Sequence, residues 1–159
     1  MIQIQLADLE RTRDADALMT LLNRYALDPL GGGHPLPDDS QQNLVTCLRQ
    51  RRDFNAFIAW DGNTPIGLCN CFEGFSTFAS KPLLNIHDLY VEPAYRGRRL
   101  ARKMIEQAEQ LARQRGCCKL TLEVLSKNHA AKQAYLGSGF TPYQLDQQHG
   151  VAEFWHKPL

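Results

Sequence analysis

The spacing of apolar and polar residues predicts strands alternating with helices along the chain. Period-two alternation and short apolar runs predict strands at Ile2–Leu6, Phe54–Trp60, Pro65–Phe72, Leu83–Val91, Leu120–Val124, Tyr143–Leu145 and Ala152–His156. Apolar residues at helical spacing predict helices at Asp14–Tyr25, Ser40–Arg51 and Gly97–Gln114, and from Asn128 to about Leu136. A Gly-rich break separates the first two helices, and Asp61-Gly62-Asn63 predicts a hairpin turn.

The order of these elements predicts an α/β protein built on one mixed sheet. The early strands are linked by short turns and are expected to pair antiparallel, whereas the helix at Gly97–Gln114 joins two strands as a βαβ crossover. Helices are expected on both faces of this sheet. The chain of 159 residues has no repeat and no linker-like segment, so we expect a single domain over residues 1–159.

Composition narrows the classes of protein that fit. Hydrophobic residues make up 43% and charged residues 22%, as in ordinary soluble domains. No apolar run approaches the roughly 20 residues of a membrane span. Met1–Gln5 lacks the basic and apolar regions of a signal peptide, which predicts a cytoplasmic protein without a membrane partner. The net charge of +1 gives no reason to expect nucleic-acid binding.

The five cysteines do not form a pattern typical of disulfides or metal ligands. Their number is odd, and neither Cys69 and Cys71 nor the adjacent Cys117 and Cys118 match a CxxC site. On a strand, Cys69 and Cys71 would lie on one face. We therefore expect reduced, mostly buried thiols and no metal.

A basic cluster is the first local feature that points to a ligand. Five basic residues fall within eight positions at the start of a predicted helix: Arg96, Arg98, Arg99, Arg102 and Lys103. Cations are unfavourable at a helix N-terminus, so the pattern favours a multiply charged anion bound there. Gly97 would let the backbone approach it closely. A solvated basic surface patch is the alternative. Neither the P-loop nor the GxGxxG nucleotide-binding pattern occurs in the chain.

Two segments resemble the GNAT superfamily of N-acetyltransferases. The family's acetyl-CoA-binding segment follows a strand and reads Gln or Arg, two residues, Gly, one residue, then Gly or Ala. Arg96 and Ala101 match its ends, and Arg99 stands where the glycine is usual. The segment Asn128–Phe140 is similar to a second family pattern, in which Asn, Ala and Tyr precede Gly-Phe. The resemblance implies the GNAT fold, with about four helices flanking a mixed sheet that has two splayed strands, and acetyl-CoA as co-substrate.

The resemblance also implies which residues bind the cofactor. In similar enzymes the strand before the basic loop carries a bulge that offers backbone N–H groups to the thioester and pantetheine. The implied cofactor contacts are Leu89, Tyr90, Val91, Arg96, Gly97, Arg98, Arg99, Leu100, Ala101, Arg102, Asn128 and Tyr135. Asn128 as a plain helix cap and Tyr135 as a core aromatic are the structural alternatives.

Acetyl transfer from a thioester to an amine needs an acid for the departing thiolate and a base for the amine. The resemblance places Tyr135 beside the sulfur, where its phenol, with a pKa of about 10, can act as the acid. For the base, His87 and Asp88 are polar residues inside an apolar strand. Adjacent strand residues point to opposite faces, so only one of them is expected to face the cleft. Three possibilities therefore remain open: His87 is the base, Asp88 is the base, or neither residue is.

The sequence does not identify the acceptor. The irregular segment Tyr25–Asp39 could lie over the acceptor cleft, and its acids Asp28, Asp38 and Asp39 either attract a cationic amine or are solvated turn residues. We predict an N-acetyltransferase that moves the acetyl group of acetyl-CoA to a primary amine of a small molecule, and the resemblance implies a homodimer. Acetylation of a protein N-terminus or lysine, and a catalytically silent acyl-CoA-binding module, are the alternatives.

Overall fold

The computed structural model describes residues 1–159 as two compact units, Met1–Leu122 and Glu123–Leu159. The first unit contains the sheet, with strands β1 (Ile2–Leu6), β2 (Phe54–Asp61), β3 (Thr64–Ser76), β4 (Lys81–Val91) and β5 (Leu120–Leu122). It also contains helices α1 (Thr12–Leu27), α2 (Asp38–Arg49) and α3 (Leu100–Gln114), and a short 3₁₀ turn at Pro93–Tyr95. The second unit contains helix α4 (His129–Leu136).

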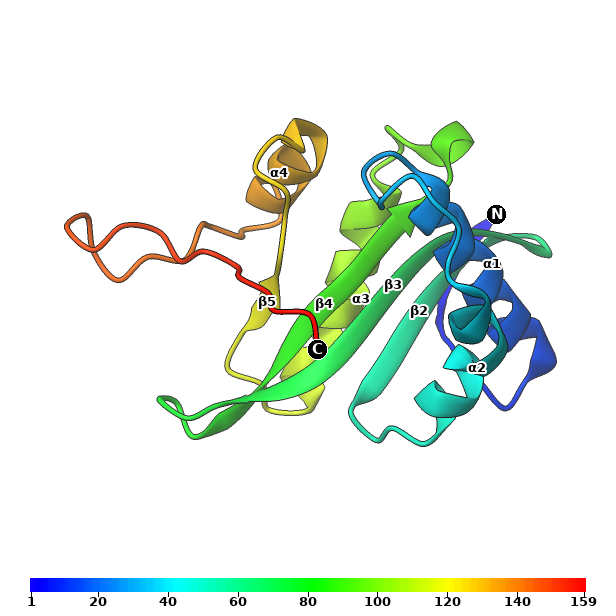
Figure 1. Cartoon of the computed structure of the whole chain (residues 1–159), viewed down its shortest axis with the longest axis horizontal. Coiled ribbons are helices and arrows are strands. Elements are labelled where there is room, and N and C mark those ends of the chain that lie inside the picture. The colour runs from blue at the N-terminus through cyan, green and yellow to red at the C-terminus, as the bar shows by residue number, and fades with distance from the viewer. The chain divides into compact units, whose positions relative to one another are not determined.

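The sheet is mixed, with the strand order β1-β2-β3-β4-β5 (Figure 1). The first four strands pair antiparallel in sequence order, and β4 pairs with β5 in parallel across the α3 crossover. This arrangement confirms the predicted α/β fold with one mixed sheet. No helix combines the length and the apolar surface that a bilayer crossing demands.

Helices cover both faces of the sheet, as expected. Leu18 and Leu21 of α1 pack against Leu68 of β3 in a buried cluster on one face, which we call the α1 face. On the other face, α3 lies so close to β3 that a Cβ on Gly67 would approach Cε of Met104 to 3.0 Å. Gly67 and Leu68 are adjacent on the strand and therefore point to opposite faces. The same alternation decides which residues of β4 share the α1 face.

Helix α3 begins at Leu100 rather than at Gly97, where its start was predicted. Gly97 and Arg99 have φ angles of 77° and 59°, and residues in this left-handed region cannot continue a right-handed helix. β5 likewise ends at Leu122 rather than at Val124.

The two strands predicted near the C-terminus do not form. Their residues, Tyr143–Leu145 and Ala152–His156, lie outside every strand, and only an isolated antiparallel bridge joins Gln144 to Val151. All side chains of both segments are exposed, so the alternating pattern has no buried face that would stabilise a strand.

The cysteines are all free, as predicted. Cys69 and Cys71 are buried on one face with their Sγ atoms 3.7 Å apart, and the neighbouring thiol, together with burial, raises the pKa of Cys69. The Cys69 thiol is therefore protonated near neutral pH. The expectation of mostly buried thiols is wrong for Cys47 and Cys118, which are exposed.

Candidate functional site

β4 has a free edge directly before the basic loop. β5 pairs with β4 only from Leu84 to Ile86, whereas β4 continues to Val91. The two neighbouring strands therefore part after Ile86, and residues 87–91 have no strand partner on the side of β5. This matches the splayed pair of strands that the family resemblance implies.

A β-bulge interrupts β4 at His87. The register pairs Ile86 with Cys71 and Asp88 with Asn70, which leaves His87 as the extra residue. A bulge on this strand is what the resemblance implies, and its position in this chain is upstream of the three residues from which backbone contacts were expected.

The bulge reverses the direction of the backbone groups that follow it. The Leu84 N–H points toward β5 and the Glu92 N–H toward β3, although both would point the same way in a regular strand. Successive N–H groups along a strand point to alternate sides. Because the Glu92 N–H points toward β3, that of Tyr90 does too, and those of Leu89 and Val91 point to the free edge. Of the three expected backbone contacts, Leu89 and Val91 thus face the open side.

The bulge also brings His87 and Asp88 to one face, which corrects the expectation that these neighbours point apart. The His87 ring lies edge-on to Phe72, with 5.4 Å between centroids. Asp88 Oδ2 accepts a hydrogen bond of 3.0 Å from Asn70 Nδ2. Phe72 and Asn70 are two residues apart on β3 and so share a face. His87 is exposed there, and Asp88 is half-buried.

Asn70 is a residue of this site that the sequence alone did not indicate. Its side chain is 2% exposed, and its Oδ1 has no hydrogen-bond partner. The available signal was an asparagine inside the apolar run of β3, because a buried amide needs a hydrogen-bonding partner. Its partner lies on another strand, so the sequence could not name it.

Tyr25 of α1 packs over the same part of the sheet. Its ring centroid lies 5.8 Å from that of Tyr90. Burial raises the pKa of Tyr25, and the negative charges of Asp88 and Asp28 raise it further. The Tyr25 hydroxyl is therefore close enough to both carboxylates to respond to their charge.

The acids of the segment after α1 are mostly paired. Asp28 Oδ2 accepts a 2.7 Å hydrogen bond from Arg96 Nη2, and this bond is the main reason that the pKa of Asp28 is lowered. Asp39 accepts a 2.8 Å hydrogen bond from Asn43. Asp88, unlike Asp28, has no cationic partner and is bound only by the neutral amide of Asn70. A cationic acceptor would therefore meet Asp88 more readily than Asp28.

The loop between β4 and α3 presents backbone donors to solvent. The four N–H groups from Arg99 to Arg102 have no hydrogen-bond partner in the chain. Arg99 has φ 59° and ψ 20°, the left-handed conformation that glycine adopts most easily. Arg99 therefore keeps the backbone shape of the glycine that is usual at this position. Unpaired donors at a helix N-terminus are suited to bind an anion.

The cations of this loop are not equivalent. Arg102 forms an ion pair of 3.1 Å with Glu106. The Arg98 guanidinium lies 5.2 Å from the ring centroid of Tyr95. Arg99 and Lys103 have no acidic partner within ion-pair distance, and Arg99 is exposed. Arg98 also has no acidic partner, so the charges of all three side chains are available to a bound anion.

The second unit carries the other two predicted site residues. Asn128 Oδ1 accepts a 3.1 Å hydrogen bond from the Ala131 N–H, which confirms that it caps α4. Tyr135 is half-buried near the end of α4, with its ring 6.0 Å from that of Phe140. The Phe140 N–H donates back to the Tyr135 carbonyl at 3.0 Å, which holds the Gly-Phe end of the motif against the helix.

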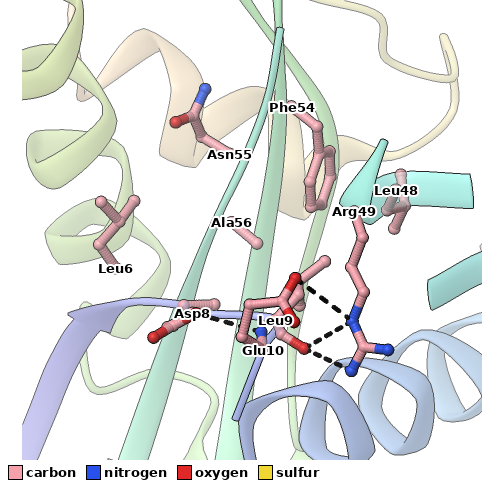
Figure 2. Close-up of a pocket in the computed structure, with 10 residues that line it drawn as sticks. Leu6, Asp8, Leu9, Glu10, Leu48, Arg49, Phe54, Asn55 and Ala56 are labelled. Atoms are coloured by element: carbon pink, nitrogen blue, oxygen red, sulfur yellow. Dashed lines mark hydrogen bonds and ion pairs between the residues drawn. The ribbon is translucent and has the colours of Figure 1, made fainter. Parts of the chain in front are cut away.

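A cavity of about 210 Å³ lies away from the basic loop (Figure 2). It is lined by the end of β1, residues 7–10, the end of α2 and Phe54–Ala56. Ala59 of β2 pairs with Gly67, and Gly67 pairs with Val91 at the end of β4 that leads into the basic loop. Phe54–Ala56 therefore lie toward the end of β2 that is farther from that loop. None of the predicted site residues lines this cavity.

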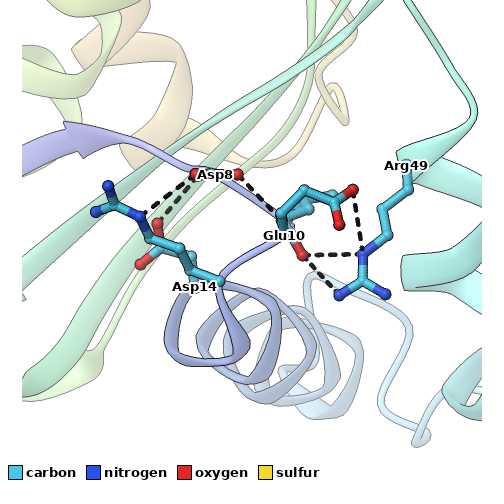
Figure 3. A network of polar contacts seen from close by, with 6 residues as sticks. Asp8, Glu10, Asp14 and Arg49 are labelled. Carbon is cyan, nitrogen blue, oxygen red and sulfur yellow. Dashed lines mark hydrogen bonds and ion pairs between the residues drawn. The ribbon is translucent and has the colours of Figure 1, made fainter.

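A polar network closes that end of the sheet (Figure 3). Arg49 donates through Nε and Nη2 to the Leu9 carbonyl, at 2.9 and 2.7 Å, and lies 3.9 Å from Glu10. The Asp8 N–H donates to Asp14 at 3.0 Å. These bonds tie the end of α2 to the start of α1, which is a packing role. No group of three His, Cys, Asp or Glu side chains anywhere in the chain is placed to hold a metal ion.

Comparisons with known proteins agree with this architecture. Among solved structures, a probable acetyltransferase superposes with a TM-score of 0.79 at 23% identity, covering 99% of both chains. An aminoglycoside acetyltransferase from an uncultured soil metagenomic sample, crystallised with sisomicin, superposes with a TM-score of 0.78 at 17% identity, covering 99% of this chain and 97% of that one. At such identities the likeness shows the fold alone.

Relatives found by sequence have higher identity to this chain than these structures, but they align over a smaller part of it. Thialysine N-epsilon-acetyltransferase of Caenorhabditis elegans is 32% identical over 95 residues, which are 57% of this chain and 59% of that protein. The Bos taurus protein of the same name is 30% identical over 95 residues, 60% of this chain and 52% of its own length. The chain thus spans little more than half of these curated relatives. The model of the acetyltransferase (GNAT) family matches residues 16–140, and the chain therefore belongs to that family.

Proposed function

We propose that this protein transfers the acetyl group of acetyl-CoA to a primary amine of a small molecule. The observation that carries the proposal is the row of unpaired N–H groups at Arg99–Arg102, directly after the free edge of β4. The relatives named for thialysine and for streptothricin, the latter from Streptomyces lavendulae and 37% identical over 75 residues, support an amine acceptor.

The cofactor would lie along the β4 edge and the start of α3. In this proposal the pyrophosphate accepts hydrogen bonds from the Arg99–Arg102 backbone, with Arg99 and Lys103 supplying charge. The N–H groups of Leu89 and Val91, which point to the free edge, would donate hydrogen bonds to the pantetheine amides and the thioester oxygen. Asn128 orders the start of α4, the helix that carries Tyr135.

The reaction is a direct attack on the thioester. A base removes a proton from the acceptor ammonium, and the freed nitrogen lone pair forms a bond to the thioester carbon. The oxyanion that develops is stabilised by backbone N–H groups of the β4 edge. As the carbon–sulfur bond breaks, the Tyr135 hydroxyl protonates the departing thiolate, and the second proton that the nitrogen loses on becoming an amide restores that hydroxyl. Asp88 and His87, which the bulge places on one face, are the two candidates for the base.

Release of free thiol measures this activity directly. Purified protein would be incubated with acetyl-CoA and a panel of diamines, polyamines, thialysine and aminoglycosides, and acetyl-CoA binding would be measured by isothermal titration calorimetry. Binding with amine-dependent thiol release is the expected result. Thiol release only with peptides would favour acetylation of proteins, and binding without any turnover would favour a silent acyl-CoA-binding module. Absence of binding would overturn the proposal.

The two candidate bases are separated by their pH–rate profiles. If Asp88 is the base, Asp88→Asn removes the acidic limb of kcat/KM and lowers kcat by roughly 10²- to 10⁴-fold, whereas His87→Ala retains that limb. The opposite pattern would assign the base to His87.

A further inference from the structure

Asn70 uses its only hydrogen bond to hold Asp88. The two residues are directly opposite in the β3–β4 register, and Asn70 Nδ2 lies 3.0 Å from Asp88 Oδ2. The amide cannot be turned over, because its oxygen would then face the carboxylate oxygen. The hydrogen bond therefore requires that Asp88 Oδ2 act as the acceptor, which leaves Asp88 Oδ1 as the oxygen free to take up a proton.

Stability alone does not explain an amide at this position. The neighbours Leu68, Cys69 and Cys71 are all 0% exposed, and Asn70 is 2% exposed. Its Oδ1 has no partner, and a buried acceptor left without a donor destabilises the folded state. An apolar side chain of similar shape would remove that penalty. The amide therefore needs a reason other than stability, and for Asn70 that reason is its hydrogen bond to Asp88.

We infer that Asn70 is a positioning residue that orients Asp88 as the general base of the reaction. The inference rests on the proposed acetyl transfer and deepens it. Asp88 Oδ1 takes a proton from the acceptor ammonium, the nitrogen lone pair is freed to attack the thioester carbon, and the proton later passes from Asp88 to solvent. Asn70 itself touches neither the acceptor nor the cofactor.

The geometry favours Asp88 over His87 for this role. Without the extra residue in β4, His87 rather than Asp88 would face Asn70. His87 is held by an edge contact with the Phe72 ring and makes no hydrogen bond. A proton acceptor has to be fixed in direction to work efficiently, and of the two residues only Asp88 is fixed by a hydrogen bond.

Three titratable groups surround Asp88 and enter any pH profile. They are Tyr25 from α1, Cys69 from β3 and His87 on β4 itself. Cys69 is buried with its pKa raised, and the pKa of Tyr25 is raised as well. Both are therefore neutral across the acidic limb, so a change in that limb reports Asp88 or His87.

The test compares Asn70→Leu with Asn55→Leu, a matched control. Asn55 is the other buried asparagine with one unpartnered amide atom, and it lies on β2, away from Asp88. Asn70→Leu is expected to lower kcat about 10- to 100-fold. It should move the acidic limb of kcat/KM to higher pH, because the donor that favours the ionised base is lost. Its Kd for acetyl-CoA should not rise, and its Tm should not fall. Asn55→Leu should lower Tm through the loss of the Arg115 contact and leave the pH profile unchanged.

Asn70→Asp and a double mutant guard against a folding artefact. A second carboxylate beside Asp88 disfavours ionisation, so Asn70→Asp should also shift the acidic limb to higher pH. In an Asp88→Asn background, Asn70→Leu should change kcat little further, because the two residues act as one unit. A wild-type pH profile in both Asn70 variants, or full additivity with Asp88→Asn, overturns the inference while the acetyltransferase activity stands. Wild-type protein that binds no acetyl-CoA overturns the proposed function itself.

Discussion

The Arg96 guanidinium donates a hydrogen bond of 2.7 Å from Nη2 to Asp28. The first residue of the cofactor motif therefore forms an ion pair within the protein. Its Nε donates to the Val91 carbonyl at 2.9 Å, and its charge lies 5.7 Å from the Tyr90 ring. One side chain thus joins the segment after α1 to the end of β4. The segment expected to cover the acceptor is fastened to the loop expected to hold the cofactor.

The Asp28–Arg96 bond predicts a pH-dependent contribution to stability. The bond lowers the pKa of Asp28, so its contribution is complete above the ordinary value of 3.8 and is lost as the pH falls through the lowered value. Both partners are partly exposed, so Asp28→Asn should reduce the free energy of unfolding by about 1 kcal/mol or less at neutral pH. Urea denaturation should show this difference shrinking toward about pH 2. An equal difference at both pH values would contradict the assignment.

Arg99 predicts a gain in stability on replacement by glycine. Its left-handed backbone costs a residue with a Cβ about 1 kcal/mol, and Arg99→Gly should recover that amount in urea denaturation. The proposed phosphate contact predicts that the same change weakens acetyl-CoA binding and makes the affinity less sensitive to salt.

Ser80→Gly is the matched control for that change. Ser80, with φ 50°, is the other non-glycine residue at positive φ, and it lies in the β3–β4 turn, far along the chain from the basic loop. It should gain similar stability and leave acetyl-CoA affinity unaltered. If Arg99→Gly also leaves affinity and salt dependence unaltered, its guanidinium does not contact phosphate.

The proposed acid predicts a specific kinetic defect in Tyr135→Phe. Loss of the hydroxyl should lower kcat by roughly 10- to 10⁴-fold, because the thiolate then leaves unprotonated. The Kd for acetyl-CoA should change little, because the ring and its contact with Phe140 are retained. Steady-state kinetics and calorimetry on the same preparation separate the two effects. A variant with near wild-type kcat would remove Tyr135 from the mechanism.

Tyr25 predicts a titration that reports the charge of Asp88. The pKa of Tyr25 is raised above its ordinary 10.0 by burial and then by Asp88 and Asp28. Asp88→Asn should lower it toward that value, as measured by ultraviolet absorbance, with Tyr25→Phe identifying its share of the signal. Asp61→Asn is the control, because Asp61 accepts a hydrogen bond from Tyr95 instead. No change in Asp88→Asn would place the two groups farther apart than the structure has them.

Much of the fold could be predicted because periodicity is a local property. The apolar stripe that includes Leu100, Met104 and Ala108 identifies α3, and the same residues are buried in the structure. The order of hairpins followed by a crossover then leads to a mixed sheet. Local pattern failed for Tyr143–Leu145 and Ala152–His156, because alternation stabilises a strand only where a core is available on one side.

The sequence by itself determined the order of the elements from β1 to α4, the basic segment before α3 and the motif residues around Arg96 and Tyr135. Only the tertiary structure decided the bulge at His87, because register depends on the neighbouring strand rather than on the residue itself. It also decided the pairing of Asn70 with Asp88, which are 18 positions apart and meet across two strands. Hydrogen bonds between distant segments leave no periodic trace in the chain. The contacts on which the chemistry of the site depends therefore could not be predicted from the sequence.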